Sequence, residues 1–233
     1  MNPALPVSDA AGADRLPWGR IIGLAATLAA LWLLWNTRVV YPIRILVTFL
    51  HESSHGLAAV LTGGRVDRIT VASNGSGLCF SRGGWRWVIL PAGYLGSMFW
   101  GSVILITACR TRWGKVLSLV LGLGLVALTF FYVRSWFGFA AGLLIGAALA
   151  SAGRWLPEDA NEALLTCIGS ASCLYAIFDI RDITRVSGPT DASMFSAEIF
   201  PLPPAVWAVL WGALAVVCLA VALRVALAPG RSR

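Results

Sequence analysis

Two histidines and a glutamate lie within five consecutive residues of an apolar stretch. His51 and His55 are the only histidines of the 233-residue chain, and with Glu52 they form the pattern H-E-x-x-H. In a helix, residues four apart lie on one face about one turn apart, so both imidazoles can bind one tetrahedral zinc ion. In such sites the metal lowers the pKa of its water to about 7, and the glutamate takes a proton as water attacks a carbonyl. The pattern therefore predicts a hydrolytic Zn²⁺ site with Glu52 as the catalytic base and His51 and His55 as metal ligands.

A different interpretation of the same three residues is a buried hydrogen-bonded cluster, or the lining of a proton or ion path. Ionisable groups inside a hydrophobic span are energetically costly, so they are expected to serve a function. No second ionisable cluster marks a path through the other apolar segments. The metal site is therefore the favoured interpretation.

A third protein ligand is expected, because catalytic zinc sites commonly have three. No histidine is left, so the ligand must be an aspartate, a glutamate or a cysteine. Asp179 is the first candidate because it lies at the end of a distant apolar segment, and Asp191 and Asp182 are the alternatives. Each of these aspartates could instead pair with Arg181 or Arg185. The five cysteines form no C-x-x-C pair and are interpreted as small core residues.

The composition indicates which elements must position these residues. Hydrophobic residues make up 58% of the chain and charged residues 12%, against about 45–50% and about 25% in soluble globular proteins. A soluble enzyme is thereby excluded. Apolar segments that can form membrane helices lie at about 20–36, 43–62, 88–108, 116–133, 135–152, 161–180 and 204–228. The fold class predicted is an all-α polytopic membrane protein with six or seven transmembrane helices and a short β-hairpin between the second and third.

The short connection between the fourth and fifth apolar segments leaves two arrangements open. The two segments are joined only through Arg134 and Ser135. Two full spans and a turn fit there only if the helix ends are trimmed. Otherwise six spans and a kinked or re-entrant piece are expected.

One membrane-embedded domain is predicted for residues 19–228. An arm over 1–18 precedes it, a tail over 229–233 follows it, and polar loops interrupt it at about 64–87 and 181–203. The arm lacks a basic start and a cleavage site, so the first span is expected to remain uncleaved. The net charge of +7 predicts contact with the headgroups of the lipid bilayer, and no basic cluster indicates nucleic acid.

The loop between the second and third segments carries the signals of a β-hairpin. Residues 66–71 alternate apolar and polar side chains, 73–77 are turn residues, and 78–80 can return as a strand. The free edge of such a hairpin could pair with an extended substrate segment. Alternatively, the hairpin only caps the helix bundle.

Small residues recur on one face of the fifth segment. Gly138, Gly142 and Gly146 are spaced four residues apart, which favours close helix packing. The partner helix can belong to the same chain or to another copy, so the spacing leaves the oligomeric state open.

Three sequence blocks together resemble the site-2 protease class of intramembrane zinc metallopeptidases, in its compact bacterial M50B-like branch. They are residues 51–56 with the H-E-x-x-H motif, residues 61–66 after it, and Ala92-Gly93-Tyr94-Leu95-Gly96 in the next segment. The resemblance extends over about residues 40–200. It implies a zinc ion inside the bilayer, bound by His51, His55 and an aspartate of a later helix that corresponds best to Asp179.

The resemblance also implies a function and a location. The chain is expected to hydrolyse peptide bonds in or near the membrane-spanning segments of other proteins, in the bacterial inner membrane. Gly93 and Tyr94 are the expected substrate-binding residues of the intervening helix. The chain has Phe178-Asp179-Ile180 where better-known members have Asp-Gly, and Gly93-Tyr94 where they have Gly-Pro. The alternative is therefore an inactive M50-like membrane protein that binds a metal or a partner helix.

Overall fold

The protein is described by a computed structural model covering residues 18–182 and 190–228, without the side chains of residues 176 and 179–182. Helices and one hairpin follow each other in this part of the chain as α1 (Trp18–Leu34), α2 (Tyr41–Leu61), β1 (Arg65–Val71), β2 (Gly77–Arg82), α3 (Arg86–Arg110), α4 (Gly114–Tyr132), α5 (Trp136–Trp155), α6 (Glu158–Asp182), α7 (Asp191–Glu198) and α8 (Pro204–Leu227). Each predicted apolar segment coincides with a helix. The predominantly helical architecture with a hairpin between α2 and α3 is confirmed.

Four of the described helices are long and apolar enough to cross a membrane, namely α3, α4, α5 and α8. The apolar helix α1 is shorter, with 17 residues. The polar residues of the H-E-x-x-H motif lower the hydropathy of α2. The chain is an integral membrane protein, and the count of six or seven spans stays a prediction.

The α4–α5 connection shows how two long helices fit around a short turn. α4 ends at Tyr132 and α5 begins at Trp136, so each helix is one residue shorter there than the apolar segment. The connecting residues leave the helices to pair with β1: the Arg134 N–H donates to the Ile69 carbonyl (2.9 Å), and the Ser135 hydroxyl donates to the Val71 carbonyl (2.9 Å). The helix ends are therefore trimmed at this connection.

The hairpin is antiparallel, with Val71 opposite Gly77 and Arg65 opposite Arg82. Two hydrogen bonds from Arg82 to Asp67 (2.6 and 2.8 Å) join the strands on the exposed side and hold the pKa of the Asp67 carboxyl below its usual range. The α4–α5 connection covers the outer edge of β1, whereas no strand of the described chain covers the outer edge of β2. The hairpin therefore has one free edge.

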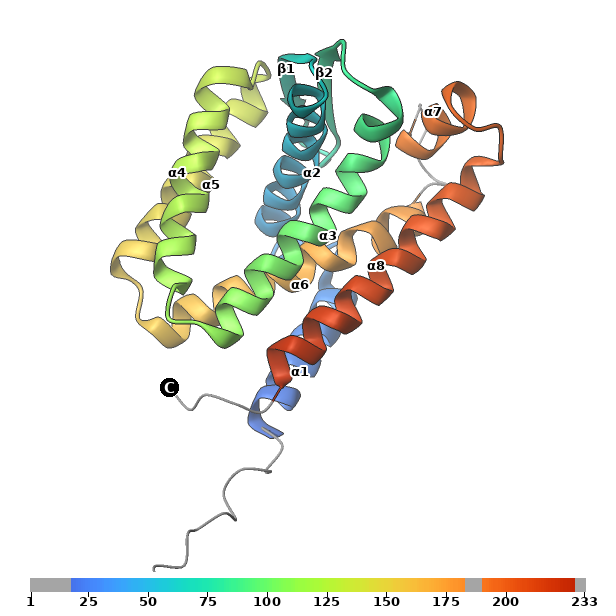
Figure 1. Ribbon diagram of the computed structural model, residues 1–233. Helices are drawn as coiled ribbons and strands as arrows, with labels where there is room; N and C mark the ends of the chain where they lie inside the picture. The colour runs from blue at the N-terminus through green and yellow to red at the C-terminus, as the bar shows by residue number, and fades with distance from the viewer. Residues whose placement is uncertain (1–17, 183–189, 229–233) are drawn as a thin grey trace, which may run out of the picture.

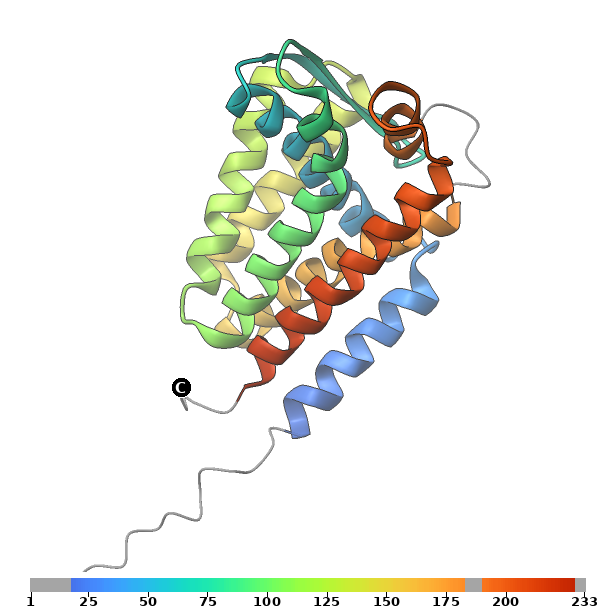
Figure 2. The ribbon, with the colours of Figure 1, turned by 45° about the vertical axis from the view of Figure 1, so that its right-hand side comes forward.

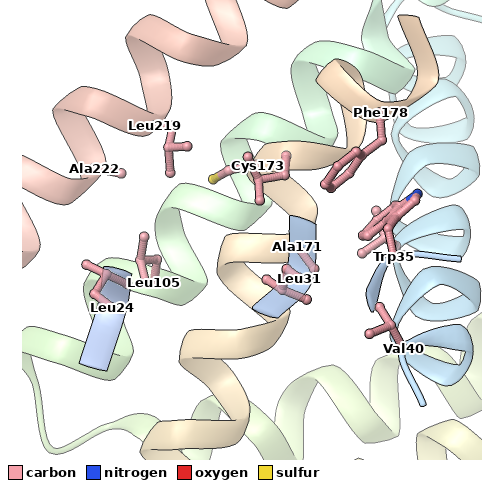
Figure 3. Packing of buried hydrophobic residues seen from close by; sticks show 12 residues of the cluster. Leu24, Leu31, Trp35, Val40, Leu105, Ala171, Cys173, Phe178, Leu219 and Ala222 are labelled. Atoms are coloured by element: carbon pink, nitrogen blue, oxygen red, sulfur yellow. The ribbon is translucent and has the colours of Figure 1, made fainter. Parts of the chain in front are cut away.

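The helices form two groups on either side of α2, as Figure 1 and Figure 2 show. α4 and α5 lie against each other, while α3 packs against α2, α6 and α8. The helix α1 packs on α6 in a cluster of buried apolar side chains that includes Leu31, Trp35 and Phe178 (Figure 3). This packing fixes α2, which bears the motif, in the interior of the domain.

The glycine face of α5 is used within the chain. A Cβ at Gly146 would lie 2.8 Å from a methyl group of Val126 and 2.9 Å from the Gly122 carbonyl oxygen, both on α4. A Cβ at Gly142 would overlap the Thr129 side chain of the same helix. The predicted close packing therefore occurs between α5 and α4.

Candidate metal centre

The H-E-x-x-H motif lies on the buried face of α2. Helical spacing brings the Nε2 atoms of His51 and His55 to 3.1 Å from each other. Both residues and Glu52 are at most 7% exposed. Polar groups so deeply buried need partners to offset the loss of hydration.

Asp191 approaches both histidines from a distant part of the chain. Its Oδ2 atom lies 3.0 Å from Nε2 of His51 and 3.1 Å from Nε2 of His55. Asp191 is the first residue of α7, and a capping box fixes this helix start: the Ser193 N–H donates to the Thr190 hydroxyl (3.2 Å), and the Thr190 N–H donates to the Ser193 hydroxyl (2.8 Å). Ligand atoms of His51, His55 and Asp191 all lie within 4.8 Å of one another.

The donor set and its surroundings fit a zinc ion. Two imidazole nitrogens and one carboxylate oxygen form a usual catalytic zinc set, which leaves a fourth position open. The His55 Nδ1 atom donates a hydrogen bond to the Ile89 carbonyl (2.6 Å), so its Nε2 atom has a free lone pair for a metal. The His51 Nδ1 atom is buried and has no hydrogen-bond partner in the described part of the chain. Of the two imidazoles, only that of His55 is thus oriented by a backbone carbonyl.

Gly93 on α3 keeps space free beside the imidazoles. A Cβ at this position would overlap the Nε2 atoms of both His51 and His55. The next residue, Tyr94, is 2% exposed and packs edge-on against the His51 ring with 5.2 Å between the ring centroids. Gly93 therefore leaves room at the candidate ligand atoms, and Tyr94 packs against one of the rings.

A cavity of about 500 Å³ opens beside His51, His55 and Asp191. Glu52 lines it from α2 and the residues of β2 line it from the opposite side. A Cβ at Gly77 would lie 2.5 Å from the Glu52 Oε1 atom, so the start of β2 passes directly over the carboxylate. Burial and the neighbouring Glu52 charge raise the pKa of the Cys79 thiol to about 12, which leaves this cavity residue protonated at neutral pH.

The short helix that carries Asp191 is anchored at its other end. Arg86, at the start of α3, donates two hydrogen bonds to Glu198 at the end of α7 (2.8 and 2.6 Å). Phe195 packs on Trp207 of α8, with 4.6 Å between the ring centroids. Because α7 is only eight residues long, these contacts at its far end fix its direction and, with it, the position of Asp191.

The structure thus brings His51, His55 and Asp191 together, with Glu52, Gly93 and Tyr94 around them. The side chains of Asp179 and Asp182 lie outside the described residues, although both residues belong to α6. Ligation by either of them stays a prediction.

Two features of the site were missed from the sequence. The helix α7 lies inside the expected polar loop, and its signal was the T-x-x-S pattern of Thr190 and Ser193, a variant of the usual capping box. Arg44 and Arg86 line the cavity. The spacing of Arg44 could have predicted its place at the cavity. It lies eight residues before Glu52, which is two steps of four residues along one side of the helix.

Comparisons with known proteins give one match. Neither the curated proteins nor the solved structures contain a match to the chain. The family model described as Peptidase M50B-like matches residues 24–222. This range includes the histidines, Asp191 and every helix from α2 to α7. The chain therefore belongs to the M50B-like peptidase family of membrane metallopeptidase-like proteins.

Proposed function

We propose that the protein is an intramembrane zinc metalloprotease that hydrolyses peptide bonds in or near the membrane-spanning segments of other proteins. The observation that carries the proposal is the convergence of His51, His55 and Asp191 beside Glu52 at one cavity. We assign His51, His55 and Asp191 as the zinc ligands. The resemblance to the compact bacterial branch of the family extends the proposal to the bacterial inner membrane.

Glu52 is the general base and then the general acid of the proposed reaction. A bound zinc ion supplies Lewis acidity, which polarises a carbonyl and makes a water molecule more acidic. Glu52 accepts a proton from the attacking water and donates it to the amine that leaves the cleaved peptide bond. Its place beside the ligand histidines and under β2 suits a base that acts on a substrate in the cavity.

The free edge of β2 supports a role in holding the substrate. A peptide bond inside a helix has its carbonyl shielded by the i to i+4 hydrogen bond, so the segment must unwind before water can attack it. An unwound segment exposes backbone groups that need partners in an apolar environment. Since β2 both lines the cavity and has an uncovered edge, we propose that the substrate extends along β2 and pairs with it.

The test measures zinc per chain and cleavage of a membrane-helix reporter for the purified wild type and four variants. Glu52→Gln is expected to retain zinc and lose cleavage. His55→Ala and Asp191→Asn are expected to lose both. Asp179→Asn is the matched aspartate control and is expected to retain zinc.

Three results would contradict parts of the proposal. Cleavage in Glu52→Gln equal to that of the wild type would exclude the mechanism. Retained zinc in Asp191→Asn together with zinc loss in Asp179→Asn would move the third ligand to Asp179. A wild type that binds zinc and cleaves no reporter would favour the inactive, metal-binding alternative.

A further inference from the structure

Arg44 lies at one end of the cavity that holds the candidate metal centre. It belongs to the first turn of α2 and lines the same cavity as Glu52 and the two histidines. Its guanidinium is 5.7 Å from the centre of the Trp35 ring, and its Nη2 atom is 3.6 Å from where a Cβ of Gly75 would lie. The guanidinium of Arg44 therefore lies between the Trp35 ring and the hairpin turn at Gly75.

The surroundings of Arg44 hold its side chain at the cavity. Trp35 stacks on Phe178 with 4.1 Å between the ring centroids, and Figure 3 shows these two rings facing each other. On the other side, the Thr48 hydroxyl donates to the Gly75 carbonyl (2.9 Å), which ties the hairpin turn to α2. Trp35 on one side of the guanidinium is thus held by packing on Phe178, and the hairpin turn on the other side is held by a hydrogen bond to α2.

The charge of Arg44 is not neutralised by the described residues. Their ion pairs join other residues, and the one other cavity-lining arginine among them, Arg86, is paired with Glu198. The hydrogen bond of Arg44 to a neutral group is long, from Nη1 to the Trp35 carbonyl at 3.5 Å. A half-buried cation in a membrane domain is costly without a partner, so the cavity offers a place for an anion.

The distance between Arg44 and Glu52 sets where that anion would lie on a substrate. Eight residues of helix separate them, which corresponds to about 12 Å at 1.5 Å per residue. An extended peptide covers that distance in about three or four residues. The guanidinium of Arg44 therefore lies at a fixed distance from Glu52, next to which the peptide bond would be attacked.

We propose that Arg44 determines substrate specificity by binding an acidic side chain three or four residues from the cleaved bond. The partner class is a membrane protein with an aspartate or glutamate at that offset. The inference rests on the proposed function, since it assumes that the cavity accepts an extended peptide. A guanidinium binds a carboxylate through two parallel hydrogen bonds, which favours it over the amide of glutamine.

The experiment compares matched peptides that differ only in carrying glutamate or glutamine at scanned positions. Their affinities are measured for the full-length Glu52→Gln protein, which is expected to leave the peptides intact. The protein is kept in a neutral maltoside detergent, so that no anionic lipid competes with the peptides. The best glutamate peptide is expected to bind about tenfold more tightly than its glutamine partner. Adding Arg44→Gln should bring this ratio close to one, Arg44→Lys should retain part of it, and Arg44→Glu should bring it below one because it would repel the glutamate peptide.

Arg38→Gln is the matched control, because Arg38 is an exposed arginine outside the cavity lining, and it should leave the ratio unchanged. In parallel, mass spectrometry locates the bonds that the wild type cleaves in the peptide set, and acidic residues are expected at one offset of three or four.

Equal binding of glutamate and glutamine peptides by the Glu52→Gln protein would overturn the inference, as would a ratio that persists in Arg44→Gln. A glutamate preference that depends on Arg44, with no cleavage by the wild type, would contradict the peptidase proposal alone. Cleavage without an acidic preference would contradict the role of Arg44 alone.

Discussion

Glycine allows close contact both between α5 and α4 and between α3 and α2, with different results. Between α5 and α4, Gly142 and Gly146 lie against Thr129 and Val126, and the space that the missing side chains leave is filled by the partner helix. Between α3 and α2, Gly93 lies against the imidazoles of the H-E-x-x-H motif. The first contact is packing alone, whereas the second keeps space beside candidate ligand atoms.

The difference lies in what each glycine faces. At α4 and α5 the neighbouring atoms are mainly backbone and aliphatic groups, so the gain is dispersion and close packing, as in many membrane helix pairs. At α3 and α2 the neighbours are the Nε2 atoms of His51 and His55, and both lie within hydrogen-bond distance of Asp191. Spacing of small residues therefore predicts close contact, and only the facing residues decide whether that contact is structural or chemical.

The largest effect is expected for Gly93→Ala. The added methyl group would overlap the Nε2 atoms of His51 and His55, so the variant should lose zinc and cleavage while remaining folded. Zinc per chain and reporter cleavage are measured together with the helical circular dichroism signal. Gly124→Ala is the control, because a Cβ there meets no atom within 4 Å. Full zinc content in Gly93→Ala would show that the space beside the imidazoles is not needed.

An intermediate effect, on stability and not on chemistry, is expected for Gly122→Ala. Its Cβ would overlap the backbone of Ala150 on α5, and overpacking of this kind costs about 1–3 kcal/mol. Thermal unfolding in detergent should shift to lower temperature, with zinc per chain unchanged. Gly124→Ala on the same helix should unfold at or slightly above the wild-type temperature because alanine favours helix. Zinc loss in Gly122→Ala would mean that the two helix contacts are coupled.

The smallest effect is expected at the ion pair that anchors α7. Arg86 and Glu198 are 45% and 41% exposed, and exposed pairs contribute about 0–1 kcal/mol. Glu198→Gln should therefore weaken zinc binding only a few fold, and added salt should reduce the difference from the wild type. Zinc titrations of both proteins at low and high salt test this expectation. A loss of zinc as complete as that in Asp191→Asn would make the pair essential for placing α7.

The same pair predicts a pH dependence. Hydrogen bonds from Arg86 lower the pKa of Glu198 from its ordinary value of 4.5. A lowered pKa in the folded state means that the stabilisation is complete above the ordinary value and is lost as the pH falls through the lowered one. The difference in zinc affinity between the wild type and Glu198→Gln should therefore be constant between about pH 6 and 8. A difference that changes within this range would have to come from another titrating group.

Local patterns were sufficient for the long helices, for the hairpin and for the shared helix face of the two histidines. Apolar runs located each long helix, alternation and turn residues located the hairpin, and the four-residue spacing put His51 and His55 on one face of α2. These features depend on residues close together in the chain, whose geometry is set by the helical and strand repeats. The short helix α7 was missed because its eight residues are too few to show an apolar repeat.

Contacts between distant segments had to come from the tertiary structure. Asp191 meets His51 across 140 residues, and no repeat in the sequence ranks it above Asp179 or Asp182. The free edge of β2 likewise depends on the α4–α5 connection covering β1, and the open position of Arg44 depends on Trp35 and the hairpin turn. Sequence patterns establish which residue types share a helix face, whereas the packing of whole helices establishes what that face meets.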